Sequence, residues 1–267
     1  MYHLLSVHPT RLEAVTAHDK TLIHWSLRDG TPTILTQRKI NDAGDICAIA
    51  AAPEGEYVAV ASLAPITDRH GEIQYALYPF GPVYDFDEDK GDMYAPCKIT
   101  LYNWHDLSVA QTISLLGSGA SILSMCFSPD GRWLAAADGR GVVFLIDRRA
   151  GQIALTFTEL GGKDLSGLMF DPTSTYLTVG YSDMGDGGMA LYRLEHGELH
   201  EVIKDYFDTF VYHPDDEDDG PITNLWLRET IFQVAFSPDG AMLAIATNDN
   251  NEQCGYLSVY HTQSGDC

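Results

Sequence analysis

Basic residues are scarce in this chain of 267 residues, which has 16 Lys and Arg against 38 Asp and Glu and a net charge of −22. So few cations make nucleic acid a poor partner, because phosphate contacts need a surplus of Lys or Arg on at least one face. The same charge disfavours binding to an anionic membrane surface. We therefore expect neither nucleic acid nor a membrane among the partners of this protein.

Long hydrophobic runs are also missing. No stretch approaches the ~20 apolar residues that a membrane-spanning helix needs, and the longest runs, such as 141–146, have the length of a strand. The first residues, Met1-Tyr2-His3, lack the basic start of a secretory signal. The five cysteines are an odd number without Cys-x-x-Cys spacing, which favours thiols over disulfides. These absences predict a cytoplasmic protein.

One pattern does occur five times: an apolar strand ends in Pro, a turn follows, and a second apolar strand begins. Its clearest copies, 127–131 and 236–240, both read Phe-Ser-Pro-Asp-Gly, and the others contain Pro9, Pro53 and Pro172. Pro presets the first corner of such a turn, and Gly takes a backbone angle that other residues resist. Each copy continues into a third strand, and the first four continue into a fourth. Four short strands in a repeat of roughly 43 residues favour a propeller over a sandwich or barrel.

These residues resemble the WD-repeat (WD40) family. The likeness rests on the two Phe-Ser-Pro-Asp-Gly runs, each followed by Leu-Ala and a strand near a Trp-Asp position, although the family's hydrogen-bonded tetrad is mostly missing. The resemblance implies an all-β fold, a β-propeller of about five recognisable four-stranded blades whose last blade lacks its fourth strand. It maps the family's structural turn Asp to Asp19 and Asp186. It also implies a non-catalytic scaffold or adaptor on which proteins or peptides dock.

The spacing of the copies locates two insertions in one propeller domain that covers the whole chain. We expect blades at about 2–40, 44–116, 120–158, 164–203 and 230–267. The second copy has about 32 extra residues between its second and third strands, and about 19 extra residues precede the fifth copy. These acidic insertions are 63–97 and 204–230. Because the strands of a blade run up and down, both insertions are expected on the same face.

The insertions combine acidic and aromatic side chains, with net charges of −5 for 63–97 and −6 for 204–230. Aromatic residues supply contact area at interfaces, and carboxylates attract basic partners. This composition predicts a surface that binds a basic protein or peptide. Two other interpretations stay open: the run 215–219 is a solvated loop, or the aromatic residues fold back onto the propeller. The predicted partner-binding residues are Tyr84, Asp85, Phe86, Asp87, Asp89, Tyr206, Phe207, Phe210, Tyr212, Asp215, Asp216 and Trp226.

The candidates for chemistry are weak. A run of carboxylates from Asp85 resembles a calcium loop, but its sixth residue is Lys90 and its twelfth is Pro96. His196 and His200 lie in an expected hairpin, too far apart along a strand to share one ion. We therefore predict no catalytic residue, metal or cofactor. The alternative is an enzyme, or an accessory propeller domain of the hydrolase or lactonase type, which would need acids, histidines or metal ligands that converge at the channel mouth.

The last copy stops after its third strand, at 255–260, so one strand edge is expected to be unpaired. An unpaired edge is a template for further pairing. Three explanations are compatible with the sequence. The chain is a piece of a longer propeller with additional blades, the segment 206–212 fills the edge, or a partner donates a strand.

Overall fold

The computed structural model describes residues 4–41, 46–63, 66–67, 73–74, 97–115, 121–139, 141–157, 164–183, 186–207, 229–249 and 254–264. Throughout these ranges the regular elements are antiparallel β-strands, apart from one short 3₁₀ turn, η1 (Arg28–Gly30). The all-β prediction is therefore confirmed. The chain divides into two compact units, residues 1–168 and 169–267.

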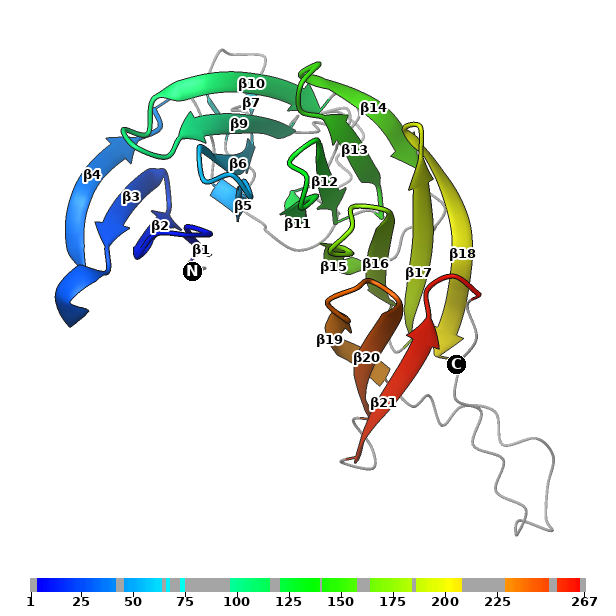
Figure 1. Cartoon of the computed structure of the whole chain (residues 1–267). Helices are drawn as coiled ribbons and strands as arrows, with labels where there is room; N and C mark the ends of the chain where they lie inside the picture. The colour runs from blue at the N-terminus through cyan, green and yellow to red at the C-terminus, as the bar shows by residue number, and fades with distance from the viewer. Residues whose placement is uncertain are drawn as a thin grey trace, which may run out of the picture. The chain divides into compact units, whose positions relative to one another are not determined.

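Three four-stranded sheets, here called sheets 1 to 3, make up the first unit (Figure 1). In each sheet the strands follow one another in space in the order of the sequence, as the regular turns predict. The strands are β1 (Leu4–Val7), β2 (Glu13–His18), β3 (Thr21–Ser26) and β4 (Thr33–Lys39) in sheet 1; β5 (Ile46–Ala51), β6 (Tyr57–Leu63), β9 (Cys97–Asn103) and β10 (Val109–Leu115) in sheet 2; and β11 (Ile122–Phe127), β12 (Trp133–Asp138), β13 (Val143–Asp147) and β14 (Gln152–Phe157) in sheet 3.

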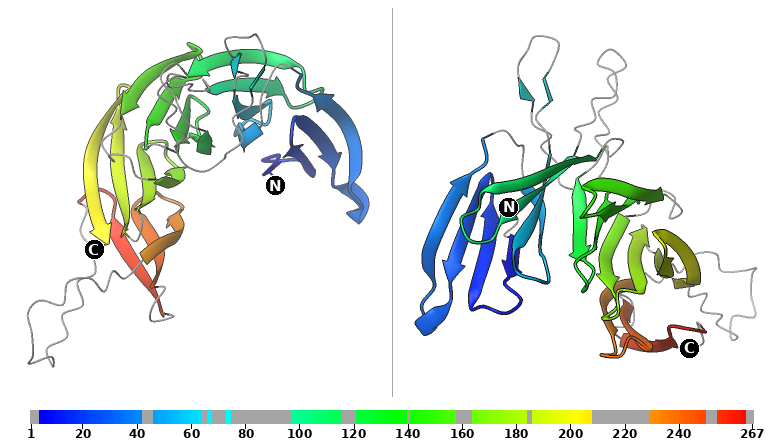
Figure 2. Two further views of the ribbon diagram at one scale, coloured as in Figure 1. Left: turned by 180° about the vertical axis from the view of Figure 1, so that it is seen from behind. Right: turned by 45° about the horizontal axis from the view of Figure 1, so that its top comes forward.

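The core of this unit lies between neighbouring sheets. The first strand β5 contacts both β1 and β11, so neighbouring sheets stand face to face (Figures 1 and 2). Between sheets 1 and 2, Val15 and Leu22 pack with Val58, Val60 and Trp104. Small residues on the second strands allow close approach of the sheets because they add little bulk between them. Residues 135–137 of β12 are all Ala, and all three are fully buried.

The second unit contains the remaining two sheets. Sheet 4 consists of β15 (Asp164–Phe170), which begins before the unit boundary, with β16 (Tyr176–Asp183), β17 (Asp186–Glu195) and β18 (Glu198–Phe207). Sheet 5 has three strands among the described residues, β19 (Glu229–Phe236), β20 (Met242–Asp249) and β21 (Cys254–His261), as the sequence predicts for the last repeat. Leu243 and Ile245 of sheet 5 pack with Met189 and Leu191 of sheet 4.

The five predicted Pro turns share one hydrogen bond. In every copy the backbone N–H of the residue before Pro donates to the carbonyl oxygen five residues later, at 2.9–3.0 Å. In sheet 3 the Ser128 hydroxyl also accepts from the Trp133 N–H at 2.9 Å and donates to Asp130 Oδ1 at 2.5 Å. Ser237 in sheet 5 does the same with Met242 and Asp239. The repeated turn in the sequence is therefore one repeated local structure.

The structure differs from the expected end of sheet 4. The prediction that residues 204–207 belong to the second insertion is wrong, because they are part of β18, where Tyr206 pairs with Gly188 and Phe207 pairs with Gly187. Strand β18 extends this far because β17 is ten residues long and supplies backbone partners for its last residues. The sequence of β18 by itself does not reveal this pairing. The connection to β19 therefore spans 208–228. The other long connection, 64–96 between β6 and β9, includes the short hairpin of β7 (Ile66–Thr67) and β8 (Ile73–Gln74).

Candidate interaction site

The predicted partner-binding residues fall mostly outside the described residues. Tyr206 and Phe207 are at the end of β18, and their backbones pair with β17. The prediction of an acidic, aromatic docking surface therefore stays a prediction. The residues outside the described part of the chain are Tyr84, Asp85, Phe86, Asp87, Asp89, Phe210, Tyr212, Asp215, Asp216 and Trp226.

The two predicted turn aspartates both lie near the junction of a second and a third strand. Asp19 follows β2 with a φ of 50°, its carboxylate is 3.3 Å from His18 Nδ1, and its side chain is largely exposed. Its carbonyl oxygen accepts from the Ile46 N–H, which begins the next sheet. Asp186 is the first residue of β17 and pairs with Asp183. Trp25, at the Trp position of the first copy, donates from Nε1 to Thr16 Oγ1 at 2.8 Å and links β3 to β2.

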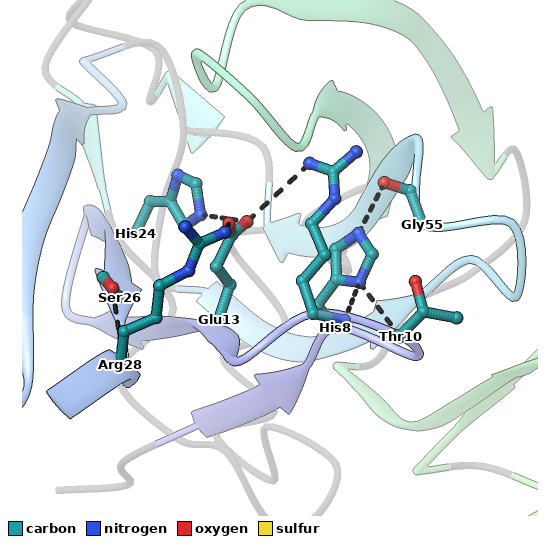
Figure 3. Close-up of polar contacts among 8 residues, drawn as sticks. His8, Thr10, Glu13, His24, Ser26, Arg28 and Gly55 are labelled. Carbon is teal, nitrogen blue, oxygen red and sulfur yellow. Dashed lines mark hydrogen bonds and ion pairs between the residues drawn. The ribbon is translucent and has the colours of Figure 1, made fainter. Parts of the chain in front are cut away.

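A cluster of polar side chains that the sequence analysis missed lies where sheet 1 meets sheet 2 (Figure 3). Its centre is Glu13, at the start of β2, whose carboxylate is 3.2 Å from Nε2 of His24 on β3. Arg11 and Arg28 approach the same carboxylate at 3.9 and 3.7 Å. Glu13 and His24 are buried, whereas both arginines are exposed. A buried carboxylate is tolerated when cations and hydrogen bonds surround it, and this one has both.

His8 joins this cluster to the first turn of sheet 2 (Figure 3). Its Nδ1 accepts from the N–H groups of Thr10 and Arg11 at 3.1 and 3.0 Å. The proton of the neutral ring is therefore on Nε2, which donates to the carbonyl oxygen of Gly55 at 3.1 Å. Burial lowers the pKa of His8, which favours this neutral form. The edge of the ring also packs against Trp104, with centroids 4.9 Å apart.

The chemistry of the cluster is structural. Trp104 packs against both His8 and His24, and among the described residues its Nε1 and the Nδ1 of His24 are buried without a hydrogen-bond partner. Glu13 and His24 are only 7% and 2% exposed. The cluster therefore holds two sheets together. One feature of the sequence could have pointed to this cluster. His8 precedes Pro9 in the first copy, where Ser128 and Ser237 precede Pro in the later copies.

Comparison with known proteins agrees with this architecture. The family described as WD domain, G-beta repeat matches residues 110–147, from β10 to the end of β13. This match identifies a WD repeat at residues 110–147. The predicted β-propeller fold is confirmed, and among the described residues its last sheet has three strands, as expected. Among curated proteins, no sequence matches the chain significantly.

Two solved propellers illustrate the likeness. The β-propeller domain of Cps50 (Swd1) from Myceliophteria thermophila has a TM-score of 0.57 at 15% identity, and the match covers 98% of this chain and 69% of that chain. A chain of the Mitotic Checkpoint Complex has a TM-score of 0.58 at 12% identity, with 96% of this chain and 60% of that chain covered. At these identities the likeness concerns the fold alone. This chain spans 69% of the first of those chains and 60% of the second.

Exposed apolar side chains lie on β1 and β21, among other places. On β1 of the first unit, Leu5 and Val7 are 62% and 54% exposed, whereas Leu4 faces the core shared with sheet 2. In the second unit, Leu257 and Val259 on β21 are 70% and 38% exposed. Within the described residues β21 pairs with β20 alone. Its outer edge therefore offers backbone groups and apolar side chains together.

We examined the described residues for metal sites and for membrane-spanning helices. No group of three or more His, Cys, Asp and Glu among these residues is placed to hold a metal ion. No described helix combines the length and hydropathy needed to cross a membrane.

Proposed function

We propose that this WD40 propeller is a non-catalytic interaction scaffold that binds a basic protein or peptide through its two acidic connections, 64–96 and 208–228. The observation that carries the proposal is where these connections leave the sheets. One joins a second strand to a third strand, and the other joins a fourth strand to the first strand of the next sheet. In an up-and-down propeller both kinds of connection belong to the same face. Each segment would therefore leave its own sheet at the corresponding end.

The charge distribution supports a basic partner. Each connection has a net charge of −5, so together they account for nearly half of the charge of the chain. Their aromatic residues add the contact area that acidic loops alone lack. A similar propeller chain comes from the Mitotic Checkpoint Complex, which is an assembly of proteins. The alternative of a hydrolase or lactonase has no comparable support in the fold comparisons.

Two deletions test this proposal by affinity capture from the native source. Removal of 82–94, or of 208–219, should leave the circular dichroism spectrum and melting temperature close to those of the wild type, because both segments lie between strands. Either deletion should abolish capture of the main basic partner. The second deletion starts at 208 because residues 206–207 pair with β17. Capture should also fall as salt rises, since surface charges are screened beyond roughly 10 Å at 0.1 M salt.

A matched control removes acidic residues from the other end of a sheet. The double variant Glu195→Gln/Glu198→Gln changes the hairpin between β17 and β18, a third-to-fourth connection. We expect it to capture the partner as the wild type does. Unchanged capture by both deletion variants would overturn the acidic docking surface.

Among the described residues β21 pairs with β20 alone, which supports a second mode of binding, in which a partner donates a strand. Strand addition uses backbone groups for affinity and alternate side chains for specificity. In the same capture experiment, Leu257→Lys should weaken a partner held in this way, because charged residues protect strand edges from pairing. Leu35→Lys, at a similarly exposed position on β4, is the control. Equal capture by both lysine variants and the wild type would exclude strand donation at this edge.

A further inference from the structure

One face of sheet 1 is apolar and lies partly open to solvent. Alternate residues of a strand share a face, and so do residues that pair across strands. Leu4 points toward sheet 2, so the next residues of β1 on the other side, Leu5 and Val7, point away from it. They are 62% and 54% exposed. This surface, here called the free face of sheet 1, consists of Leu5, Val7, Ala14, Thr16, Ile23 and Trp25.

The corresponding positions of sheet 2 form a packed interface. Leu5 stands four residues before the turn Pro of its copy, and Ile49 does so in sheet 2. Val7 and Ala51 correspond in the same way, two residues before Pro. Ile49, Ala51 and their neighbour Val58 belong to the core that sheet 2 shares with sheet 1. The free face of sheet 1 is therefore the equivalent of a face that another sheet covers.

Sheet 5 of the second unit presents the opposite kind of face to solvent. Leu243 and Ile245 pack with sheet 4, so the alternate residues Ala244 and Ala246 point away from it. Leu257 pairs with Ala246 and is 70% exposed. This surface, here called the free face of sheet 5, consists of Ala235, Ala244, Ala246, Leu257 and Val259.

Leu257 occupies a position that is fully buried in other sheets. The aromatic residues at the Trp position of sheets 1, 2, 4 and 5 are Trp25, Tyr102, Tyr192 and Tyr260. Leu257 stands three residues before the last of these, and its counterparts in the other sheets are Leu22, Ile99 and Met189. All three counterparts are 0% exposed and belong to cores that neighbouring sheets share. The exposed position of Leu257 is therefore one that elsewhere packs between two sheets.

We propose that the free face of sheet 1 in one copy of this chain packs against the free face of sheet 5 in a second copy. The two faces repeat, position by position, the two sides of the packed contact between sheets 1 and 2, so their side chains have the spacing to interdigitate. Exposed apolar faces of this kind mark protein interfaces. Each copy has one face of each kind, which makes the contact heterologous, with different surfaces on the two sides.

This self-association is separable from the acidic docking surface. Both free faces lie outside the connections 64–96 and 208–228. Two copies with a net charge of −22 each repel one another, and salt screens that repulsion. Self-association should therefore strengthen as NaCl is raised, whereas capture of a basic partner should weaken. The opposite salt dependence distinguishes a failure of one proposal from a failure of the other.

Sedimentation velocity of the full chain, over a wide range of protein concentration, tests the proposal. Leu5→Arg places a charge on the free face of sheet 1, and Ala244→Arg places one on the free face of sheet 5, on β20 and away from the edge of β21. Each should raise the dissociation constant roughly tenfold or more, because an unpaired charge is costly to bury. Val109→Arg, at a 48% exposed position of β10, is the control and should associate as the wild type does.

A mixture of the two variants shows whether the contact joins different faces. Leu5→Arg keeps an intact free face on sheet 5, and Ala244→Arg keeps one on sheet 1, so an equimolar mixture should contain dimers that neither variant forms alone. Circular dichroism establishes that each variant is folded. A wild type that stays monomeric at every protein and salt concentration would overturn the proposal. Wild-type association in either folded variant, or a mixture without dimers, would overturn it as well.

Discussion

At the scale of single residues, the turn glycines permit close contact between neighbouring sheets. Gly55 has a φ of +73°, and a Cβ built there would lie 2.4 Å from the His8 ring. In the second unit, a Cβ on Gly240 would lie 2.7 Å from Asp171 Oδ2. In both cases the side chain that precedes Pro in one sheet lies against the turn glycine of the next sheet. A glycine at this position therefore serves both the turn and the packing between sheets.

The first prediction separates these two roles. Gly55→Ala should lower the free energy of unfolding by more than the roughly 1–2 kcal/mol that a left-handed backbone costs an L-residue, because the new methyl group also displaces His8. Gly30→Ala is the matched control, since Gly30 has a φ of +71° and open space around the position of a Cβ. Urea denaturation followed by circular dichroism gives both values. Equal destabilisation of the two variants would show that contact with His8 contributes nothing.

At the scale of elements, the Pro turn works with different side chains. Ser128 and Ser237 accept a backbone N–H through a hydroxyl, whereas Asp171 in sheet 4 accepts from the N–H groups of Thr175 and Tyr176 at 2.6 Å. His8 differs, because its Nδ1 accepts from the N–H groups of Thr10 and Arg11 inside the turn. Ser and Asp are therefore equivalent acceptors at this position, whereas Ala52 in the second copy has no side-chain acceptor and still forms the turn.

The second prediction follows from this equivalence. Ser128→Ala should destabilise the protein by about 1–3 kcal/mol, because a buried backbone N–H loses its side-chain acceptor. Ser128→Asp should retain most of the stability, since Asp171 fills the same position in sheet 4. Thermal and urea denaturation of the two variants provide the comparison. If Ala and Asp at this position destabilise the protein equally, the side-chain acceptor does not stabilise this turn.

The ends of elements show where prediction from sequence failed. The five turns were predictable because Pro, Ser, Asp and Gly act within a few residues of one another. The end of β18 was not predictable, because Tyr206 and Phe207 extend the strand only by pairing with Gly188 and Gly187 of β17. The polar cluster was missed for the same reason, since Glu13 and His24 carry no local motif and meet across two strands.

At the scale of the whole molecule, the net charge of −22 opposes the compact state. Self-repulsion of a highly charged chain destabilises folding and weakens as salt screens it. The acidic connections contribute to this cost, and the proposed function supplies a reason to retain them. A basic partner would relieve the same repulsion that salt relieves.

The third prediction concerns this repulsion. An increase in NaCl from about 10 to about 100 mM shortens the screening length from roughly 30 to roughly 10 Å and should raise the melting temperature by several degrees. A variant with Asn in place of the four aspartates at 215, 216, 218 and 219 should start from a higher melting temperature at low salt and gain less. Differential scanning calorimetry measures both. A melting temperature that falls over this range would contradict the prediction.

The strands, their order and the repeated turns could be derived from the amino-acid sequence alone, because each depends on alternation and turn residues that act over a few positions. The hydrogen-bond and packing partners of buried polar side chains could not be derived in this way. His8 meets Gly55 across 47 positions, and its ring packs against Trp104, which follows β9 of the neighbouring sheet. Such neighbours exist only after two sheets pack face to face in one register, so tertiary structure alone brings them together.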